Sequence, residues 1–388
     1  MVAVMIIGAG LGGLCLAQGL RRRGVAFEVY EQDPGLNSRT QGYRFRVDDT
    51  GRQSLAECLP EDLYRLFHAT CAITMSEGRF VDTALNEITG RAVGTWSPAE
   101  VEAAPSQEVP GDLSVNRSTL REVLLIGIED RVHFGKALTH VTESDDRVIA
   151  HFADGTSEAA AVLVGADGVN SAVRRQLPLT EPHDTGAVCS YGKTILTPQV
   201  RRTVAADLLT GTSVVFAPDH AVVLDAMTFR REPFDNHHRL TTVPDYLYFA
   251  FFGPSDVLEH GNRSGAEVLA MVDRSTADWH PGLRAVFAAA EPNSVVATTV
   301  RTAGSLDAWP AGRVTLLGDA IHPMSPAAGL GANTALRDAA HLAEALRAAG
   351  AGDRSPIDAV ADYETHMRAY AAAAVAASLS GTAMLTSR

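Results

Sequence analysis

The N-terminal stretch, residues 2–31, constrains the fold of this chain more than any other part of it. An apolar run at 2–7 meets the glycine-rich turn Gly8-Ala9-Gly10-Leu11-Gly12-Gly13, which leads into a helical segment ending near Arg23. A second apolar run follows and ends at Glu31. Strand, glycine turn, helix, strand and terminal acid in this order predict a βαβ unit that binds a dinucleotide. The alternative is a chance glycine turn in an ordinary α/β domain.

Each position of this unit has a physical role in holding a dinucleotide. Gly8 would allow the tight turn, Gly10 would let the backbone approach a pyrophosphate, and Gly13 would let the helix pack close to the strand. The phosphates would lie at the helix N-terminus, beside Leu11. Glu31 would accept a hydrogen bond from a ribose hydroxyl, and an acid there favours the free 2′-hydroxyl of FAD or NAD over a 2′-phosphate.

Length and composition restrict the class of protein. At 388 residues the chain can bury a large core, which suggests two domains or one domain with a sizeable insertion. An apolar share of 46% and a charged share of 20% fit a globular enzyme, and no apolar run reaches the roughly 18 residues that span a bilayer. The net charge of −13 disfavours nucleic acid and anionic membranes as partners. With no basic leader or cleavage site before the glycine turn, we expect a cytoplasmic protein.

The cysteines predict neither a metal site nor a disulfide framework. They are scattered without the spacing of metal ligands. We therefore expect no metal, and reduced, mostly buried thiols at Cys15, Cys58, Cys71 and Cys189.

Three arginines follow the first unit at positions that suit a ligand. Residues 41–47 alternate as a strand that carries Arg44 and Arg46 on one face. Guanidinium groups suit phosphate recognition, so the two side chains are candidates to contact a pyrophosphate or ribityl chain; a solvated strand face is the alternative. Further on, a strand meets a helix with Asn116 or Ser118 as N-cap, which places Arg117 at a helix start.

The middle of the chain predicts another ligand-facing turn and then an insertion. Residues 161–165 form a buried strand that ends in a turn with Asp167 and Gly168, where open α/β sheets bind ligands, and a helix is expected at 171–177. From about 178 to 291 the pattern becomes rich in aromatic strands, at 214–216, 221–229 and 246–252, closed by a helical stretch at 265–290. We interpret this as an inserted antiparallel domain whose aromatics form a core or an apolar substrate pocket. A strand at 295–301 is then expected to return to the first domain.

A second anchor lies near the C-terminus. A buried strand at 313–317 is followed by Asp319, and a proline turn and a glycine-rich segment then lead into a helix at about 334–349. The N-terminus of such a helix offers free N–H groups and positive potential to an electron-rich ligand edge. A last helix should begin at Pro356 and run to near Leu379 as structural packing.

With these three motifs in order, the chain resembles the class A flavoprotein aromatic hydroxylases, which have the para-hydroxybenzoate hydroxylase fold. The resemblance covers nearly the full length and rests on GAGLGGL, VLVGADGVNSAVRR and VTLLGDAIHPMSPAAGLGANTAL. It implies an α/β fold: a Rossmann-like FAD-binding domain with an inserted antiparallel substrate domain and a C-terminal helix. The expected segments are FAD-binding at 1–75, 105–178 and 292–350, substrate-domain at 76–104 and 179–291, and the C-terminal helix at 351–388.

The resemblance also implies which residues hold the cofactor. The ADP half would be held by Gly8, Gly10, Gly13 and Glu31. Positions near the pyrophosphate, ribityl chain or flavin are matched by Arg39, Arg44, Arg46 and Arg117. Asp319 matches the aspartate that binds the ribityl hydroxyls, and the pyrimidine edge of the flavin is matched by Gly331, Ala332 and Asn333. Asp167 and Gly168 match a turn that serves both FAD and the reductant.

The implied activity is monooxygenation driven by NADH or NADPH. A flavin C4a-hydroperoxide would deliver one oxygen atom of O2 to an electron-rich aromatic small molecule, with hydroxylation and epoxidation both open. Pro326 and Arg46 are the candidates for flavin-adjacent residues that assist this chemistry in a dry site. For His322 we expect a structural role, because a flavin hydroxylase need not have a protein nucleophile.

Two other functions remain open from the sequence. One is a flavin reductase or dehydrogenase on the same scaffold, and the other is an NAD-binding module without flavin whose late motif is only packing. The substrate and the oligomeric state are also open.

Overall fold

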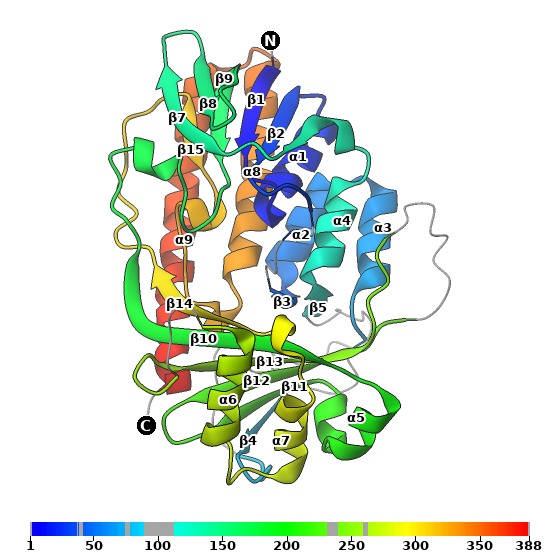
Figure 1. Ribbon diagram of the computed structural model, residues 1–388. Helices are drawn as coiled ribbons and strands as arrows, with labels where there is room; N and C mark the ends of the chain where they lie inside the picture. The colour runs from blue at the N-terminus through cyan, green and yellow to red at the C-terminus, as the bar shows by residue number, and fades with distance from the viewer. Residues whose placement is uncertain are drawn as a thin grey trace, which may run out of the picture.

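A computed structural model of the chain contains two large sheets, one above the other in Figure 1. The structure describes residues 2–36, 38, 42–73, 78–88, 112–230, 240–258 and 263–386. Arg39 lies outside these residues, as does most of the segment 76–104.

Within the described residues the first sheet has seven strands. Their order is β6-β2-β1-β9-β8-β7, with β15 also paired to β9. Their bounds are β1 (Val2–Ile7), β2 (Phe27–Glu31), β6 (Val132–Phe134), β7 (Leu138–Glu143), β8 (Val148–Phe152), β9 (Ser157–Gly165) and β15 (Val314–Leu316). β1 pairs in parallel with β2 and β9, and β15 pairs in parallel with β9. The carboxyl ends of these parallel strands therefore meet at one edge of the sheet, which is where such sheets bind ligands.

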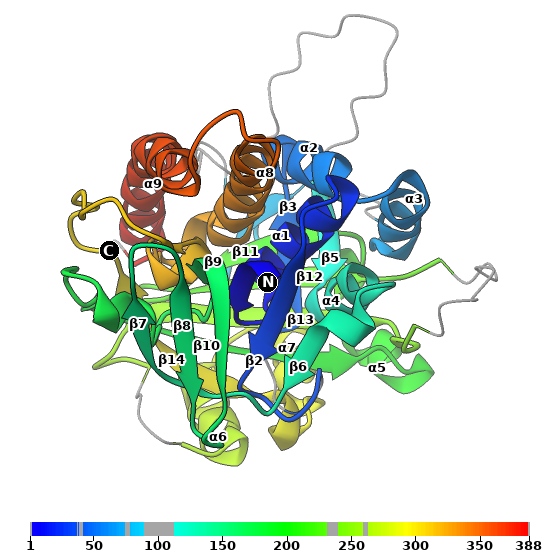
Figure 2. The ribbon, with the colours of Figure 1, turned by 90° about the horizontal axis from the view of Figure 1, so that it is seen from above.

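Helices cover one face of this sheet (Figure 2). They are α1 (Leu11–Arg22), α2 (Asp49–Cys58), α3 (Glu61–Thr70), α4 (Arg117–Leu125), α8 (Gly331–Gly350) and α9 (Pro356–Thr386). The helix α8 packs against α1, α2 and α9, and the apolar sides of these helices and of the sheet form one continuous core. None of the helices in the described part of the chain is long and apolar enough to cross a membrane.

The second sheet has six strands in the described residues and lies below the first domain in Figure 1. The order is β14-β10-β13-β12-β11-β4, with bounds β4 (Arg79–Asp82), β10 (His183–Ile195), β11 (Thr212–Phe216), β12 (Ala221–Met227), β13 (Tyr246–Pro254) and β14 (Val296–Thr302). Its pairings are antiparallel except that of β11 with β4. On the face of this sheet that points away from the first domain, aromatic side chains of β13 pack against the segment of α6 (Gly265–Ser275) and α7 (Pro281–Ala288). The short helix α5 (Pro198–Thr203) lies beside α7.

A small two-stranded sheet connects the domains. It pairs β3 (Arg44–Val47) antiparallel with β5 (Leu113–Asn116). From β3, the Arg44 side chain reaches β12 of the second sheet, where its Nε lies 2.5 Å from Oδ2 of Asp225. Arg44 is therefore held between the domains.

Most of the predicted elements are confirmed, with an α/β first domain, an inserted antiparallel sheet and a long C-terminal helix. The four cysteines are buried free thiols, as expected. The helices α2 and α3 are separated at Pro60, and the helical stretch predicted at 265–290 is two helices, α6 and α7. Where 76–104 is described, β4 does join the second sheet.

Two predictions were wrong. The strand expected at 295–301 does not return to the first domain, because β14 pairs with β10, whose other edge pairs with β13. The chain therefore leaves the second sheet only after Thr302, ten residues past the predicted boundary at 292. The helix expected at 171–177 is only a 3₁₀ turn, Arg174–Gln176. The Asp167 carboxylate accepts hydrogen bonds from the N–H groups of Ala172 and Val173, which fixes a turn there.

Candidate functional site

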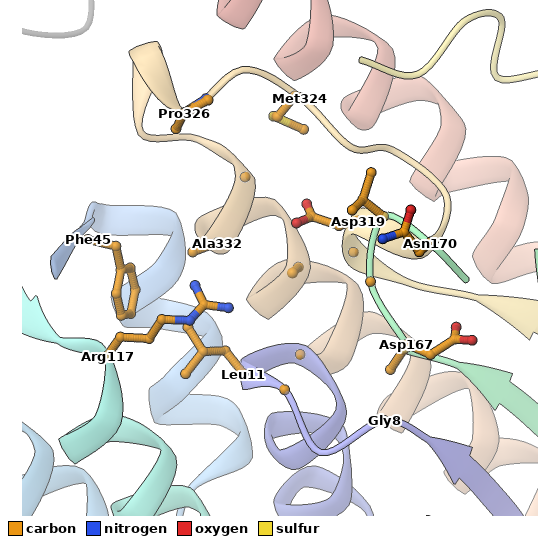
Figure 3. A pocket seen from close by; sticks show the side chains of 18 of the residues that line it. Gly8, Leu11, Phe45, Arg117, Asp167, Asn170, Asp319, Met324, Pro326 and Ala332 are labelled. Atoms are coloured by element: carbon orange, nitrogen blue, oxygen red, sulfur yellow. The ribbon is translucent and has the colours of Figure 1, made fainter. Parts of the chain in front are cut away.

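A pocket of about 810 Å³ lies where the carboxyl edge of the first sheet faces the second sheet (Figure 3). Its walls come from the glycine turn, the end of β2, strand β3, the start of α4, the turn after β9, the segment from Leu317 to Ala335, and the near face of the second sheet. Elements far apart in the sequence therefore share one cavity.

The glycine turn shows which of its glycines the fold requires and which the ligand requires. Gly8 has φ +111°, and a Cβ there would lie 2.4 Å from the carbonyl oxygen of Ala166. A Cβ on Gly13 would lie 2.1 Å from the carbonyl oxygen of Gly8, so the helix α1 can approach the strand only without it. A Cβ on Gly10, by contrast, would meet no atom within 4 Å. Gly10 therefore faces open space in the pocket, which fits the predicted close approach of a pyrophosphate.

Glu31 lines the pocket at the end of β2 and braces the glycine turn. Its Oε2 accepts a hydrogen bond from the N–H of Ala9 at 2.7 Å, and its Oε1 accepts one from the N–H of Asp33 at 2.9 Å. A carboxylate has lone pairs beyond these two bonds. The acid is thus in place for the predicted ribose contact, which stays a prediction.

Arg44 and Arg46 both line the pocket, as the alternating pattern predicted. The alternative of a solvated strand face is wrong, because their side chains are only 8% and 11% exposed. Each has a carboxylate partner: Asp225 for Arg44, and Asp112 for Arg46 at 2.9 Å. Burial lowers the pKa of Arg46, and Asp112 acts against that shift.

Arg117 stands at the start of α4, with its guanidinium directed into the pocket (Figure 3). Asn116 is the N-cap, since its Oδ1 accepts a hydrogen bond from the N–H of Thr119 at 3.0 Å. Burial lowers the pKa of Arg117, and the negative charge of Asp319 across the pocket opposes this. The predicted position at a helix start is confirmed.

Asp167 and Gly168 also line the pocket, at the turn after β9. The Asp167 carboxylate accepts a hydrogen bond from Ser171 Oγ at 2.5 Å and from the N–H of Ala172 at 2.7 Å. Burial raises the pKa of Asp167, and these bonds act against the shift. The carboxylate therefore shapes the turn, and the φ of +78° at Gly168 completes it.

Asp319 lies just after β15, and its carboxylate points into the pocket (Figure 3). The preceding Gly318 has φ +62°, which favours glycine and turns the chain toward the cavity. Burial raises the pKa of Asp319, while His322 and Arg117 lower it. Asp319 therefore lines the pocket, and its contact with the ribityl hydroxyls stays a prediction.

Behind this turn lies a buried cluster that holds it in place. His322 Nε2 lies 2.7 Å from Asp338 Oδ2, and both side chains are fully buried. The same oxygen accepts a hydrogen bond from the N–H of Gly318 at 2.8 Å, and Oδ1 accepts one from the Tyr370 hydroxyl at 2.6 Å. Burial lowers the pKa of His322, but Asp338 and Asp319 together outweigh this and the net shift is upward. His322 does not line the pocket and has the structural position that we expected.

The segment from Met324 to Ala332 forms another wall, with Pro326 exposed to the pocket. Gly331 and Ala332 line the cavity at the start of α8, where the first-turn N–H groups have no partner within the helix. The Asn333 side chain is directed elsewhere: its Nδ2 donates to the carbonyl oxygens of Arg46 and Gly329, each at 3.0 Å. Asn333 therefore braces β3 against α8, and only its N–H can serve the predicted role.

The near face of the second sheet supplies the remaining wall. Its lining side chains are Tyr191, Val223, Tyr248, Ala250 and Phe252. The sequence predicted aromatic strands and an apolar pocket but did not single out these residues. Asp338 and Tyr370 were missed as well, although an acid on the buried face of an alanine-rich helix was a signal for the first of them.

These residues fit the dinucleotide that the sequence predicted. Gly10 leaves room at the N-terminus of α1, the acids Glu31 and Asp319 line the cavity, and the Arg117 guanidinium is directed into it (Figure 3). Helix N-termini favour anionic groups, and carboxylates accept hydrogen bonds from sugar hydroxyls. The part of the pocket lined by the glycine turn, Glu31 and Asp319 thus suits an extended dinucleotide. The near face of the second sheet suits an apolar ring.

Comparison with known families agrees with this site. A family model described as "FAD binding domain" matches residues 127–378, and one described as "NAD(P)-binding Rossmann-like domain" matches residues 6–61. An FAD-dependent monooxygenase of Penicillium herquei is 30% identical over 94% of this chain and 86% of its own length. The 6-hydroxynicotinate 3-monooxygenase of Pseudomonas fluorescens is 28% identical over 90% of this chain and 83% of its own length.

Some relatives are longer proteins. A dual O-methyltransferase/FAD-dependent monooxygenase of Phaeosphaeria nodorum is 34% identical over 91% of this chain. The chain covers only 41% of that relative's length, and 44% of a dual protein of the same description from Cercospora beticola.

Solved structures share the fold. A protein of Photorhabdus luminescens assigned as an FAD-containing monooxygenase superposes with a TM-score of 0.84 at 29% identity, covering 99% of both chains. The 2,6-dihydroxypyridine-3-hydroxylase of Arthrobacter nicotinovorans, at 22% identity, superposes with a TM-score of 0.76 over 99% of this chain and 93% of its own. The chain therefore belongs to the FAD-dependent monooxygenases, with the fold of the class A flavoprotein hydroxylases and FAD as its cofactor.

Proposed function

We propose that this protein uses NADH or NADPH and O2 to insert one oxygen atom into an aromatic or other electron-rich small molecule. The observation that supports this most is that a dinucleotide cradle and an uncharged, mostly apolar sheet wall line one pocket. A cofactor held along the glycine turn and Asp319 would thus meet a substrate held against the second sheet. Bound FAD would supply the oxygen transfer, through the C4a-hydroperoxide that the family resemblance implies.

Side chains of this chain would hold and orient the cofactor. The N-terminus of α1 and Gly10 would receive the pyrophosphate, Glu31 a ribose hydroxyl, and Asp319 the ribityl hydroxyls. The first-turn N–H groups of α8, at Gly331 and Ala332, would stabilise negative charge on a bound electron-rich ring.

The sheet wall would keep water away from the reacting atoms. Val223, Ala250 and Phe252 line it, and Met324 and Pro326 line the wall that carries the start of α8. Exclusion of water is what such a reaction needs, since a wet site discards the activated oxygen as peroxide. No histidine or cysteine is found among the described lining residues, which accords with a reaction that uses no protein nucleophile.

Two measurements on the purified FAD-bound protein test the proposal. A panel of hydroxylated aromatic compounds is screened for acceleration of NADH and NADPH oxidation in air. The product of each accelerating compound is then analysed after reaction under ¹⁸O2. We expect one labelled oxygen atom in the product; a reduced or dehydrogenated product without label would instead indicate a reductase or dehydrogenase.

A further inference from the structure

The last two turns of α9 pack behind the wall of the pocket that carries Pro326. In Figure 1 this helix, drawn in red, runs along the first domain and ends beside the second sheet, where it packs on β13. Four inward-facing residues of these turns are spaced by three and four positions, which places them on one side of the helix. They are Ser378, Gly381, Thr382 and Leu385, of which only Thr382 is not fully buried.

Gly381 lets α9 lie directly against the Pro326 turn, residues 325–329. A Cβ at Gly381 would lie 3.4 Å from Cβ of Ala328 and 3.6 Å from its backbone nitrogen. A single methyl group would therefore make ordinary van der Waals contact with the turn. A longer side chain at this position would have to displace either the helix or the turn.

A hydrogen bond joins the same two elements. Oγ1 of Thr382 lies 2.5 Å from Oγ of Ser325, whose side chain is fully buried. Oγ of Ser325 also accepts a hydrogen bond from the N–H of Ala327 at 3.2 Å, within the turn. Close to the end of α9, Leu385 belongs to the apolar cluster that contains Ala327 and the near face of the second sheet. The end of α9 thus holds the turn from the side opposite the pocket.

The Pro326 turn is part of the pocket wall and leads directly into α8 (Figure 3). Pro326 and Gly329 of the turn line the cavity, and so do Gly331 and Ala332 at the start of α8. From the α8 side, Nδ2 of Asn333 donates to the carbonyl oxygen of Gly329 at 3.0 Å. A shift of the turn would therefore move the N–H groups of the first turn of α8, which are predicted to meet the flavin.

We propose that Gly381 and Thr382 are positioning residues for bound FAD, although neither is among the described residues that line the pocket. They fix the Pro326 turn, and the turn presents the start of α8 to the cofactor. When one of these contacts is removed, the turn populates displaced positions. The apparent affinity for FAD then falls in proportion to the fraction of molecules with the turn in place. This inference concerns FAD binding and does not rest on the proposed reaction.

Two variants remove the contacts, and each has a matched control. Gly381→Leu forces a side chain against the turn, whereas Gly381→Ala adds only a methyl group that fits and favours the helix. Thr382→Val deletes the hydroxyl and keeps the size of the side chain. Its control is Thr365→Val, since the Thr365 hydroxyl donates to the carbonyl oxygen of Ala361 at 2.9 Å and faces solvent. Thr382 makes the same bond to Ser378 at 3.0 Å, so valine removes an equal contact within the helix at both positions.

A third control separates positioning from stability. Val360 is fully buried in the core of the first domain, near the start of α9. It lies about 30 Å along the helix axis from Gly381. Val360→Ala should therefore lower the melting temperature without changing the Pro326 turn.

The measurements are FAD titration of each apoprotein by flavin fluorescence, the visible circular dichroism of bound FAD, and the melting temperature. Gly381→Leu and Thr382→Val should weaken FAD binding by about 2- to 10-fold and change the dichroism of the bound flavin. The controls Gly381→Ala, Thr365→Val and Val360→Ala should keep the wild-type affinity and dichroism.

Two results would overturn the assignment. One is wild-type FAD affinity and dichroism in Thr382→Val, which decides the question even where Gly381→Leu does not fold. The other is an equal loss of affinity in Thr365→Val or Val360→Ala, which would show that any weakening of α9 has this effect. Oxygen transfer is not measured in this experiment, so its outcome is independent of the ¹⁸O2 test.

Discussion

Two glycines of the turn after β1 differ in what they contact, and the difference separates folding from cofactor binding. Gly10→Ala places a methyl group in open pocket space, whereas Gly13→Ala drives one toward the carbonyl oxygen of Gly8 at 2.1 Å. We expect Gly10→Ala to keep the wild-type stability of the apoprotein and to weaken FAD binding by about tenfold or more. Gly13→Ala should lower the free energy of unfolding by about 1–3 kcal/mol or more, with or without FAD. Thermal unfolding of the apoprotein and FAD titration by flavin fluorescence measure both; similar profiles for the two variants would contradict this division.

The carboxylate of Asp319 and the imidazole of His322 differ in the same way. Asp319 points into the pocket, while His322 is fully buried against Asp338. Loss of charge-assisted hydrogen bonds to the ribityl chain should weaken FAD binding in Asp319→Ala by about 10- to 100-fold. His322→Ala should weaken it less but lower stability more, because it leaves the buried Asp338 without its ion-pair partner. Equal FAD dissociation constants in the two variants would refute the assignment of Asp319.

At the level of single residues, the sequence predicted positions better than contacts. The packing of Gly13 was correctly predicted from local geometry, and the N-cap is Asn116, one of the two residues that the sequence offered. The Asp225 partner of Arg44 lies 181 residues away, and no local pattern reports such a pair. The Asn333 side chain likewise turns toward Arg46 because of the way β3 packs on α8.

The long helix α9 carries a pH-sensitive contact with the first sheet. The Tyr363 hydroxyl donates to the carbonyl oxygen of Leu316 in β15 at 3.0 Å, and the adjacent Glu364 is only 2% exposed. Burial raises the pKa of Glu364 from 4.5 to about 7, with Thr315, Arg368 and Trp309 acting in the opposite direction. The folded protein therefore binds a proton between these pH values that the unfolded chain has released.

Because the folded-state pKa of Glu364 is the higher one, its contribution favours folding below pH 4.5 and is lost as the pH rises through about 7. Glu364→Gln should remove this dependence. Between pH 5 and pH 8, the wild type should lose about 2–3 kcal/mol of unfolding free energy relative to the variant. Urea unfolding at both pH values measures this difference; parallel pH profiles of the two proteins would show that Glu364 titrates normally.

Among the elements, helices and strands with a strong apolar periodicity were predicted correctly. The strand whose place depends on its pairing with other strands was not. The apolar strands and the helices α1 and α8 follow from periodicity. The strand β14 joins the second sheet because one edge of β10 is free to pair with it. Which edge is free is decided only when the sheet assembles, so no local sequence pattern predicts it. The placement of Tyr191 and Tyr248 in one wall of the pocket depends in the same way on the register of β10 with β13.

In the whole molecule, one pocket has to serve cofactor, reductant and substrate. The sequence contains one glycine fingerprint, and FAD would occupy it, so we expect NADH or NADPH to use a less specific site, which we predict near the Asp167 turn. We expect substrate binding to favour the arrangement in which the reductant reaches the cofactor. Oxidation of NADH or NADPH in air should then be slow alone and much faster with the true substrate. Rapid mixing, followed by the loss of visible flavin absorbance, measures this; equally fast reduction with and without every oxygenated compound would contradict substrate control.

In the proposed reaction, one atom of O2 is transferred in this pocket to a substrate held against the second sheet. Mass spectrometry of the product formed by the FAD-bound protein with NADH or NADPH under ¹⁸O2 tests it most directly. We expect a product heavier than its substrate by one ¹⁸O atom, with no label when the same reaction runs in H₂¹⁸O under ordinary O2. A product that carries no oxygen from O2 would contradict it.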